Sequence, residues 1–359
     1  MNVAFITIHV GFNFGSILQT IATSEIFKKL GHSPICVNYI PPRVMYRRYW
    51  KVAFSSPPKF VRRLLYFPFF FMSKFHYNRY LKKHCKLSKA IYDNDSFKDC
   101  CPKADVYVSG SDQIWNYKHN EGLDKHYFFD GIEGKKVAYA ASIGMTELPH
   151  VYSDYMRRQL QTYSAISVRE DSATLLLRKW GVTATHVLDP TLMLNKEEWK
   201  QFSSKRLIKE SYLFVYLPYN IVDKAQIYKS VRKIANEKAL RVVTYSDSFI
   251  CDKDADETIR FAVPGDVLSL IYYADVVVTN SFHGTAFSIN LNKQFWTYMP
   301  SSFSTRIQSI LEKCSLNDRL LSDVIKNSQI SERIDFTYTN AIIEGERVKA
   351  LEFLNKALH

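Results

Sequence analysis

Short apolar segments alternate with amphipathic segments of helical length along most of the chain, and this alternation constrains the fold more than any other feature. At the start, a strand expected over 3–8 leads through Gly11 and Gly15 into a helix expected over 16–30, and a second strand covers 35–39. A strand, a helix and a second strand in succession build parallel sheets. The chain has 359 residues, which is long enough for two such domains.

The same alternation predicts further elements in both halves of the sequence. Strands are expected over 104–109, 136–142, 165–168, 185–188, 213–217, 241–245, 276–279 and 295–298. Helices are expected over 153–162, 172–180, 196–206, 222–238, 265–273, 284–291, 304–314 and 340–358. The prediction is therefore an α/β protein with two doubly wound, Rossmann-like domains facing a cleft. We place the N-terminal domain over 1–200, the C-terminal domain over 201–335, and a helix over 336–359 that crosses back onto the first domain.

A strongly basic segment over 43–89 interrupts this pattern. It holds thirteen Lys and Arg residues and no Asp or Glu, which leaves 35 basic and 35 acidic residues elsewhere, so this segment carries the whole net charge of +13. Basic residues flank its large apolar side chains, which are Leu64, Leu65, Phe67, Phe69, Phe70, Phe71 and Met72. We expect helical hairpins broken by Pro57-Pro58 and by Pro68.

The composition of the basic segment is compatible with three roles. Basic residues beside large apolar ones suit docking on an anionic membrane surface. The alternative is an insertion whose aromatic rings pack on the body of the protein while its charges stay solvated. A nucleic-acid contact is the least favoured reading, so we expect no nucleic-acid partner.

Composition constrains the compartment. Six cysteines, at positions 36, 85, 100, 101, 251 and 314, show no CxxC spacing, so reduced thiols are expected. The N-terminus lacks a charged leader, and no stretch of about 20 apolar residues predicts a membrane-spanning helix. We expect a cytoplasmic protein, held at the inner face of the cytoplasmic membrane if the basic segment binds lipid.

The clearest candidate site follows the apolar strand expected over 276–279. The chain turns at Asn280 and Ser281, and a helix opens around His283 and Gly284. A helix N-terminus offers N–H donors and a positive dipole to an anion. His283 can give or take a proton near neutral pH. The alternative is a histidine that caps or packs against the helix start.

Other polar groups also collect where strands end, which is where open α/β sheets bind ligands. They are Asn13, the residues over 112–116, Arg169, Asp189, Ser281 and His283. Asp112 and Asn116 suit sugar hydroxyls, and Trp115 could stack on a sugar ring. The alternative for this loop is a capped turn with a core tryptophan.

Two arginines are candidate anion ligands. Arg169 directly follows a buried strand and could hold a carboxylate or phosphate with both of its terminal nitrogens. Alternatively it pairs with Glu170 or Asp171. Arg306, near the start of a late helix, is a second candidate. The loop after the first strand is not GxGxxG, and we find no P-loop, no GxSxG, no metal triad and no Cys/His nucleophile.

Six segments, in this order, resemble the polysaccharide pyruvyl transferase family. They are NFGSILQT (13–20), GSDQIWN (110–116), SVRE (167–170), LDPTLML (188–194), TNSFHGTAFSINL (279–291) and STRIQSIL (304–311). The resemblance implies a GT-B-like fold and the use of phosphoenolpyruvate to place a pyruvate ketal on a sugar of a surface polysaccharide or its lipid-linked precursor. It implies no metal and no cofactor besides the donor substrate.

The resemblance also implies roles for individual residues. His283 would be the general acid. The donor would be bound by Arg169, Ser281, Gly284 and Arg306, and the acceptor by Asn13, Gln19, Asp112, Trp115 and Asn116. The family often has Arg-Leu-His where this chain has Ser281-Phe282-His283, and Arg306 is expected to supply the missing charge. Two rival functions are a nucleotide-sugar glycosyltransferase of the same architecture and a non-catalytic glycan-binding protein.

Overall fold

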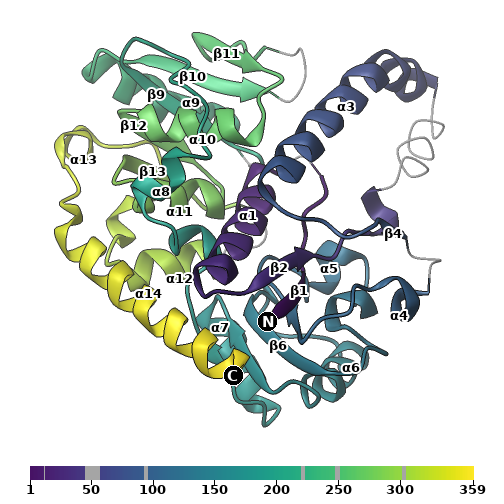
Figure 1. The fold of residues 1–359 in the computed structure, drawn as a ribbon. Coiled ribbons are helices and arrows are strands. Elements are labelled where there is room, and N and C mark those ends of the chain that lie inside the picture. The colour runs from purple at the N-terminus through teal and green to yellow at the C-terminus, as the bar shows by residue number, and fades with distance from the viewer. Residues whose placement is uncertain (12, 45–56, 93–95, 220–222, 247–250, 301–304) are drawn as a thin grey trace. The chain divides into compact units, whose positions relative to one another are not determined.

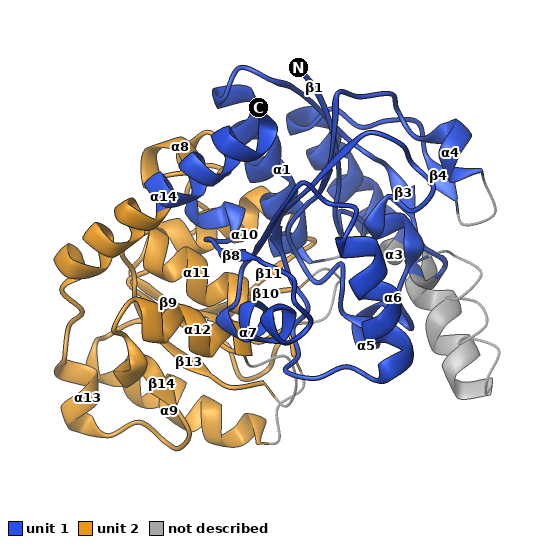
Figure 2. Ribbon diagram, turned by 90° about the horizontal axis from the view of Figure 1, so that it is seen from below, with its two compact units in different colours: residues 1–193, 347–359 blue, residues 194–346 orange. Residues whose placement is uncertain are grey.

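The structure is a computed structural model that describes residues 1–11, 13–44, 57–92, 96–219, 223–246, 251–300 and 305–359. It divides into two compact units (Figure 2). Unit 1 comprises Met1–Met193 and Arg347–His359, and unit 2 comprises Leu194–Glu346. The sequence placed the first boundary at 200, whereas the contacts place it at 193.

Unit 1 contains, in the described part of the chain, a six-stranded parallel sheet (Figure 1). Its strands in spatial order are β2 (Ser33–Cys36), β1 (Asn2–Ile6), β5 (Val106–Ser109), β6 (Lys135–Ala141), β7 (Ala165–Val168) and β8 (Thr185–His186). Apolar residues make β1 and β5 buried strands, with Phe5 opposite Val108. The chain moves from β1 outward to β2 and then returns to β5, so the topological switch point lies between β1 and β5.

Helices and short elements connect these strands. They are α1 (Phe14–Lys29), β3 (Tyr39–Ile40), η1 (Pro42–Val44), α3 (Pro57–His84), β4 (Ile91–Tyr92), α4 (Phe97–Cys100), α5 (Tyr117–Asn120), η2 (Lys125–Phe128), α6 (His150–Leu160), α7 (Asp171–Lys179) and η3 (Pro190–Leu192). The strand expected over 35–39 is split into β2 and β3, and β3 pairs with β4. Gly31 ends the α1 turn at a φ of +78°, which favours glycine.

Unit 2 repeats the architecture with a second six-stranded parallel sheet among its described residues. Its strands in spatial order are β11 (Glu257–Arg260), β10 (Arg241–Ser246), β9 (Tyr212–Tyr216), β12 (Val276–Thr279), β13 (Gln294–Tyr298) and β14 (Leu320–Leu321). The helices are α8 (Lys196–Lys200), α9 (Lys224–Glu237), α10 (Pro264–Tyr273), α11 (Phe282–Asn290), α12 (Thr305–Lys313), η4 (Asn317–Arg319) and α13 (Asn327–Ser331). The helix expected over 196–206 is only the five-residue α8.

Each unit has its own hydrophobic core, as two doubly wound sheets require. In unit 1, Ile6, Ala138 and Val168 from the sheet pack with Trp115 and Phe128. In unit 2, Leu213, Val242, Val278 and Trp296 from the sheet pack with one face of α9. Burying these strands on both faces fixes the loops that follow their carboxyl ends.

The expectation of helical hairpins in the basic segment is wrong. Instead of hairpins broken at Pro68, α3 is a single helix of 28 residues with Pro68 inside it. A proline removes one hydrogen bond and usually kinks a helix, but packing can offset that loss. Ser73, Tyr77, Leu81 and Cys85 follow one face of the helix and are buried, and α3 packs against α1. Residues 45–56 and the side chains of Leu64, Leu65, Phe67, Phe69 and Phe70 lie outside the described residues.

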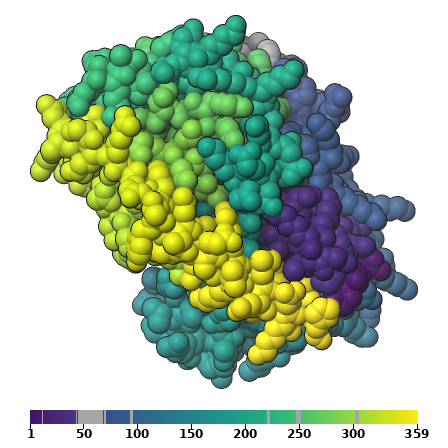
Figure 3. Space-filling view, turned by 60° about the vertical axis from the view of Figure 1, so that its left-hand side comes forward, coloured from purple at the N-terminus to yellow at the C-terminus, as the bar shows by residue number. Residues whose placement is uncertain are grey.

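The last helix, α14 (Phe336–Leu358), belongs to both units, because the division falls between Glu346 and Arg347. Arg347 Nε donates to the carbonyl oxygen of Leu192 at 2.7 Å, and Lys135 Nζ donates to that of Leu358 at 3.2 Å. Figure 3 shows the yellow C-terminal end against the purple N-terminal segment, where the rings of His32 and His359 lie 6.1 Å apart. Both ends of the described chain are thus part of unit 1.

Candidate functional site

The candidate site in unit 2 lies where β12 ends and α11 begins. The chain runs from β9 outward to β10 and β11 before it returns to β12, so the switch point of this sheet lies between β9 and β12. Open α/β sheets bind ligands outside the strand ends at such a point. Thr279 ends β12 there, and its hydroxyl donates to the carbonyl oxygen of Tyr216, the last residue of β9, at 2.7 Å.

Ser281 is the N-cap residue of α11. Its hydroxyl oxygen accepts a hydrogen bond from the Gly284 N–H at 3.4 Å, and its carbonyl oxygen accepts one from the Thr285 hydroxyl at 3.0 Å. The first turn of α11 is described in full and carries no acidic side chain. The positive end of the helix dipole is therefore not neutralised within its own first turn.

Gly284 is required by the close approach of α11 to β12. A Cβ atom at this position would lie 2.3 Å from Thr279 Oγ1 and 3.0 Å from Thr279 Cβ. Any other residue would push the start of α11 away from the end of β12. Gly284 therefore fixes the position of the neighbouring His283.

The side chains of His283 and Arg306 each lie near the ring of Phe282. His283 is 2% exposed, and its ring centroid lies 5.2 Å from that of Phe282 in an edge-to-face arrangement. The guanidinium carbon of Arg306, on α12, lies 5.4 Å from the same Phe282 centroid, which is the geometry of a cation–π contact. The structure thus places an imidazole and a guanidinium beside the first turn of α11.

Arg169, the other expected donor ligand, lies in unit 1 and is bonded to two carboxylates of its own chain. Its Nη2 donates to Asp112 Oδ1 at 3.0 Å, and its Nη1 donates to Asp189 Oδ2. Burial alone would lower the pKa of Arg169, but the charges of Asp189, Asp112 and Glu170 outweigh it and raise the pKa. The expected pairing with Glu170 or Asp171 is corrected: the partners are Asp112 and Asp189. A donor anion would have to compete with both.

At the switch point of unit 1, the loop after β1 and the start of α1 are bonded to the loop after β5. The Ser16 hydroxyl donates to Asp112 Oδ2 at 2.6 Å, and the Thr7 hydroxyl donates to the Ser111 carbonyl oxygen at 2.5 Å. Asn13 Oδ1 accepts from the N–H of Gly15 at 2.9 Å as the N-cap of α1. Of the expected acceptor ligands, Asp112 thus joins the loop after β5 to α1, and Asn13 caps the start of that helix.

Gln19, Trp115 and Asn116 are also buried within unit 1. The Gln19 amide donates to Thr7 Oγ1 at 2.8 Å. The Trp115 ring is fully buried and stacks on Phe128 at 5.6 Å, so it has no exposed face for a sugar ring. Asn116 caps α5, accepting from the N–H groups of residues 118 and 119. The structure matches the alternative interpretation of this loop, a capped turn with a core tryptophan.

Glu170 was missed as an organising residue of this sheet edge. Its Oε1 accepts hydrogen bonds from the N–H groups of Ile143 and Gly144, both at 2.8 Å, and from the Ser142 hydroxyl at 3.1 Å. A buried carboxylate directly after a strand is the signal that points to such a role. Across the described residues, His, Cys, Asp and Glu side chains form no cluster that could hold a metal ion.

The two sheets and their switch points define the class of protein. Solved structures with this fold include the UDP-GlcNAc 2-epimerase of Neisseria meningitidis (10% identity, TM-score 0.52, covering 99% of this chain and 100% of that one). Others are the N-terminal domain of Candida albicans trehalose-6-phosphate phosphatase (6%, 0.54, 99% and 96%) and Anabaena HepE in complex with UDP and glucose (8%, 0.50, 100% and 99%). The chain is thus an α/β protein of GT-B type with two Rossmann-like units.

The sequence identifies the family within that class. The sequence model of the polysaccharide pyruvyl transferase family matches residues 13–302, which is most of the chain, and the protein belongs to this family of transferases. No curated protein matches the sequence.

Proposed function

We propose that this protein transfers pyruvate from phosphoenolpyruvate to a sugar of a surface polysaccharide, or of its lipid-linked precursor, and forms a cyclic ketal. Family membership supports the transfer of a pyruvyl group. The observation that carries the proposal is the convergence of His283 and Arg306 on Phe282, at the switch point of unit 2.

The proposed reaction begins with proton transfer to carbon. His283 protonates the methylene carbon of phosphoenolpyruvate, which leaves an oxocarbenium-like centre on C2. A sugar hydroxyl adds to C2 and loses its proton. The C2–phosphate bond then breaks, phosphate leaves with a proton, and a second hydroxyl of the sugar adds to C2 and loses its proton. The products are the ketal and inorganic phosphate, and one acid provides the protonation of carbon that the enol phosphate needs.

The donor carries a carboxylate and a phosphate, and unit 2 offers two features that favour anions. One is the N-terminus of α11, capped by Ser281 and without acid in its first turn. The other is the guanidinium of Arg306 beside that turn. In this proposal Arg306 supplies the positive charge that the resemblance would place at position 281. Gly284 allows the start of α11 to lie close to the end of β12.

The decisive experiment measures phosphate release from phosphoenolpyruvate with a panel of lipid-linked and nitrophenyl sugars. Wild type should release phosphate only when an acceptor is present, and His283→Ala should lose at least about 100-fold of that rate, as is typical for a lost general acid. His150→Ala, an exposed histidine on α6, is the matched control and should keep full activity. No release with any sugar, together with stabilisation by UDP or GDP, would instead favour a nucleotide-sugar glycosyltransferase.

We also propose that α3 holds the protein on an anionic membrane surface at the cytoplasmic side. Along the described outward face of α3, the exposed side chains are aromatic toward the N-terminus and basic toward the C-terminus. Phe71 and Phe75 are 51% and 55% exposed, and exposed Arg79, Lys82 and Lys83 follow. Exposed aromatic rings beside cations suit the interface between lipid chains and anionic headgroups. In the part of the chain that the structure describes, no helix is apolar over enough length to cross a bilayer.

Vesicle sedimentation tests this second proposal without removing the helix, whose inner face is part of the core. Binding should occur with phosphatidylglycerol vesicles and be much weaker with phosphatidylcholine vesicles. The double variant Phe71→Ser/Phe75→Ser should bind at least tenfold less, whereas Leu175→Ser, which changes an exposed apolar residue on α7, should bind normally. Undiminished binding by the α3 double variant would refute the proposal.

A further inference from the structure

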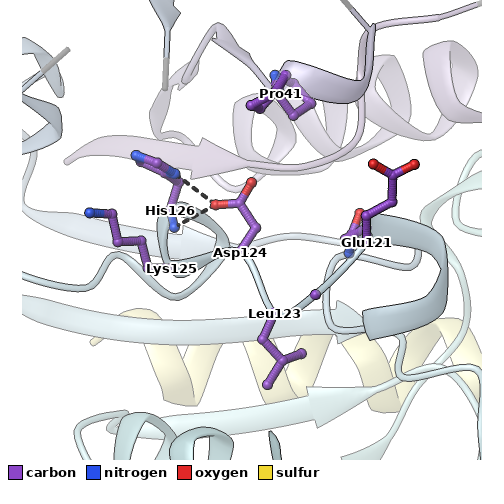
Figure 4. A pocket seen from close by; sticks show the side chains of 9 residues that line it. Pro41, Glu121, Leu123, Asp124, Lys125 and His126 are labelled. Carbon is purple, nitrogen blue, oxygen red and sulfur yellow. Dashed lines mark hydrogen bonds and ion pairs between the residues drawn. The ribbon is translucent and has the colours of Figure 1, made fainter. Parts of the chain in front are cut away.

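A polar pocket of about 290 Å³ opens in unit 1 and belongs to no site described so far (Figure 4). It lies between Pro41-Pro42, which follow β3, and the segment from Asn120 to His126, which links α5 to η2. Its size is near the lower end of the roughly 300–1,000 Å³ of small-molecule sites. A pocket of this size suits one small ring rather than a nucleotide.

Asp124 is the most firmly held group of the pocket. Its Oδ2 accepts a hydrogen bond from the Tyr39 hydroxyl at 2.7 Å, and its Oδ1 accepts from the backbone N–H of His126 at 3.0 Å and contacts His126 Nδ1 at 2.7 Å. A carboxylate has about four acceptor positions, so these contacts leave one for a ligand. Burial alone would raise the pKa of Asp124, but the hydrogen bonds from His126 and Tyr39 outweigh it and lower the pKa.

The groups that hold Asp124 are themselves fixed by packing. The His126 ring stacks on the Tyr39 ring with centroids 4.3 Å apart, and the Phe97 ring meets His126 edge-on at 4.8 Å. Tyr39 and His126 are each 1% exposed. The carboxylate of Asp124 is therefore preorganised, and little ordering remains to oppose ligand binding.

The charge of the lining selects against anions. Figure 4 shows the carboxylates of Asp124 and Glu121 on the side of the segment that faces Pro41. Among the described residues that line the pocket, Lys125 carries the one ammonium group beside these two carboxylates, and His126 is held against Asp124. Neither phosphoenolpyruvate nor phosphate suits such a lining, whereas hydroxyl groups that donate hydrogen bonds to carboxylates do.

Asn120 connects this pocket to the 110–116 loop. Its Nδ2 donates to the carbonyl oxygens of Gln113 at 3.0 Å and of Ile114 at 2.9 Å. Its Oδ1 is buried and has no hydrogen-bond partner among the described residues, so it remains able to accept one. The loop that resembles the family motif thus builds the pocket through α5, although its own side chains are buried.

We propose that this pocket binds one neutral pyranose ring of the acceptor glycan, with Asp124 and Asn120 accepting hydrogen bonds from its hydroxyl groups and Glu121 excluding acidic sugars. The assignment of that sugar to the acceptor rests on the proposed function. The recognition of a neutral sugar rests on the pocket alone.

Ligand-detected NMR tests the pocket in the absence of phosphoenolpyruvate. The probes are the methyl glycosides of mannose, glucose, galactose and their N-acetylamino forms, with glucuronate as the acidic counterpart. At least one neutral glycoside should give saturation transfer, and glucuronate should give none. Asp124→Asn should weaken binding roughly tenfold or more, because a hydrogen bond to a charged acceptor is lost.

Two further variants keep the test decisive. Asp130→Asn alters another carboxylate that accepts a tyrosine hydroxyl, that of Tyr155 at 2.8 Å, outside the pocket lining, and it should bind as wild type does. Glu121→Gln changes an exposed side chain, so it should fold even if Asp124→Asn does not, and it should admit glucuronate. The proposal would be overturned if no neutral glycoside binds to wild type. It would also be overturned if Asp124→Asn binds neutral glycosides as wild type does and Glu121→Gln still excludes glucuronate. Sugar binding without phosphate release in any assay would retain the pocket and reject the pyruvyl transfer.

Discussion

Arg169 and Asp112 are hydrogen-bonded to each other, with Nη2 and Oδ1 3.0 Å apart and both side chains almost fully buried. The sequence suggested that the first binds the donor and the second binds the acceptor. Their bond joins the end of β7 to the loop after β5, and Asp189, which follows β8, accepts a second hydrogen bond from Arg169. These residues are therefore tied to the stability of unit 1 in the structure described.

Replacing Arg169 should destabilise the fold. Arg169→Met leaves the carboxylates of Asp112 and Asp189 buried without their cation, and removing one partner of a buried ion pair costs about 3–5 kcal/mol. Chemical denaturation should show this loss in the free energy of unfolding. Lys98→Met, which breaks an exposed pair with Glu133 in the same unit, should change it by less than about 1 kcal/mol. If Arg169→Met were as stable as wild type, Arg169 would have no structural role, and ligand binding would be its remaining function.

Gly284→Ala should disturb the start of α11. The added Cβ would lie 2.3 Å from Thr279 Oγ1, so the helix must shift, at a cost of roughly 1–3 kcal/mol. Gly345→Ala is the matched control, because Gly345 lies in α14 with nothing within 4 Å of the added atom. That change should instead stabilise the protein by about 0.5–1 kcal/mol. Thermal denaturation of both variants distinguishes the close contact from a general effect of alanine.

Arg306 and Phe282 should act together on the donor. Arg306→Met should raise the KM for phosphoenolpyruvate, and Arg306→Lys should rescue it only in part, because an ammonium lacks the planar face that lies on the ring. Phe282→Leu should raise the same KM by roughly 2- to 30-fold, the equivalent of a cation–π contact of about 0.5–2 kcal/mol. Steady-state kinetics at saturating acceptor gives the values. A Phe282→Leu effect confined to kcat would contradict a positioning role.

The hydrogen bonds to Asp124 predict a dependence of stability on pH. The folded-state pKa of this carboxyl lies below its ordinary value of 3.8, so its contribution is fully present above pH 3.8. That contribution disappears as the pH falls through the lower, folded-state pKa. The difference in the free energy of unfolding between wild type and Asp124→Asn should therefore be largest near neutral pH and shrink below pH 3.8. Urea denaturation across this range checks it, and a constant difference would argue against an ionised Asp124.

Much of the fold could be predicted from periodicity. Val276–Thr279 is a strand as expected, and the following helix places His283 in its first turn. Three valines and a threonine specify the strand locally, and the capping serine two residues later specifies the helix start. Strands that are very short or polar could not be predicted, because they lack a run of apolar residues. The edge strands β11 and β14 were missed, since one is polar and the other has two residues. A proline within a helical segment predicts a break at Pro68, but this local rule does not include the packing of Tyr77 and Leu81, which holds α3 as one helix.

The roles of polar residues were harder to predict than their positions. Asp112 and Arg169 do lie at strand ends, but they are 57 residues apart, and the sequence alone does not reveal that they are bonded to each other. Trp115 presents the same difficulty, because a ring that stacks on Phe128 and a ring that stacks on a sugar have the same local sequence. The Asp124 pocket depends on Tyr39, 85 residues away, and no local motif marks such a pairing.

The return of the chain to unit 1 through α14 has a consequence for synthesis on the ribosome. Domains generally fold as units while the chain emerges from the N-terminus. Unit 2 is one continuous stretch, whereas unit 1 needs residues 347–359, which emerge only after all of unit 2 has been made. The bonds from Arg347 to Leu192 and from Lys135 to Leu358 must therefore be among the last to form. Until these bonds form, unit 1 is incomplete in the nascent chain. Unit 1 is therefore exposed to chaperones and proteases for longer than unit 2.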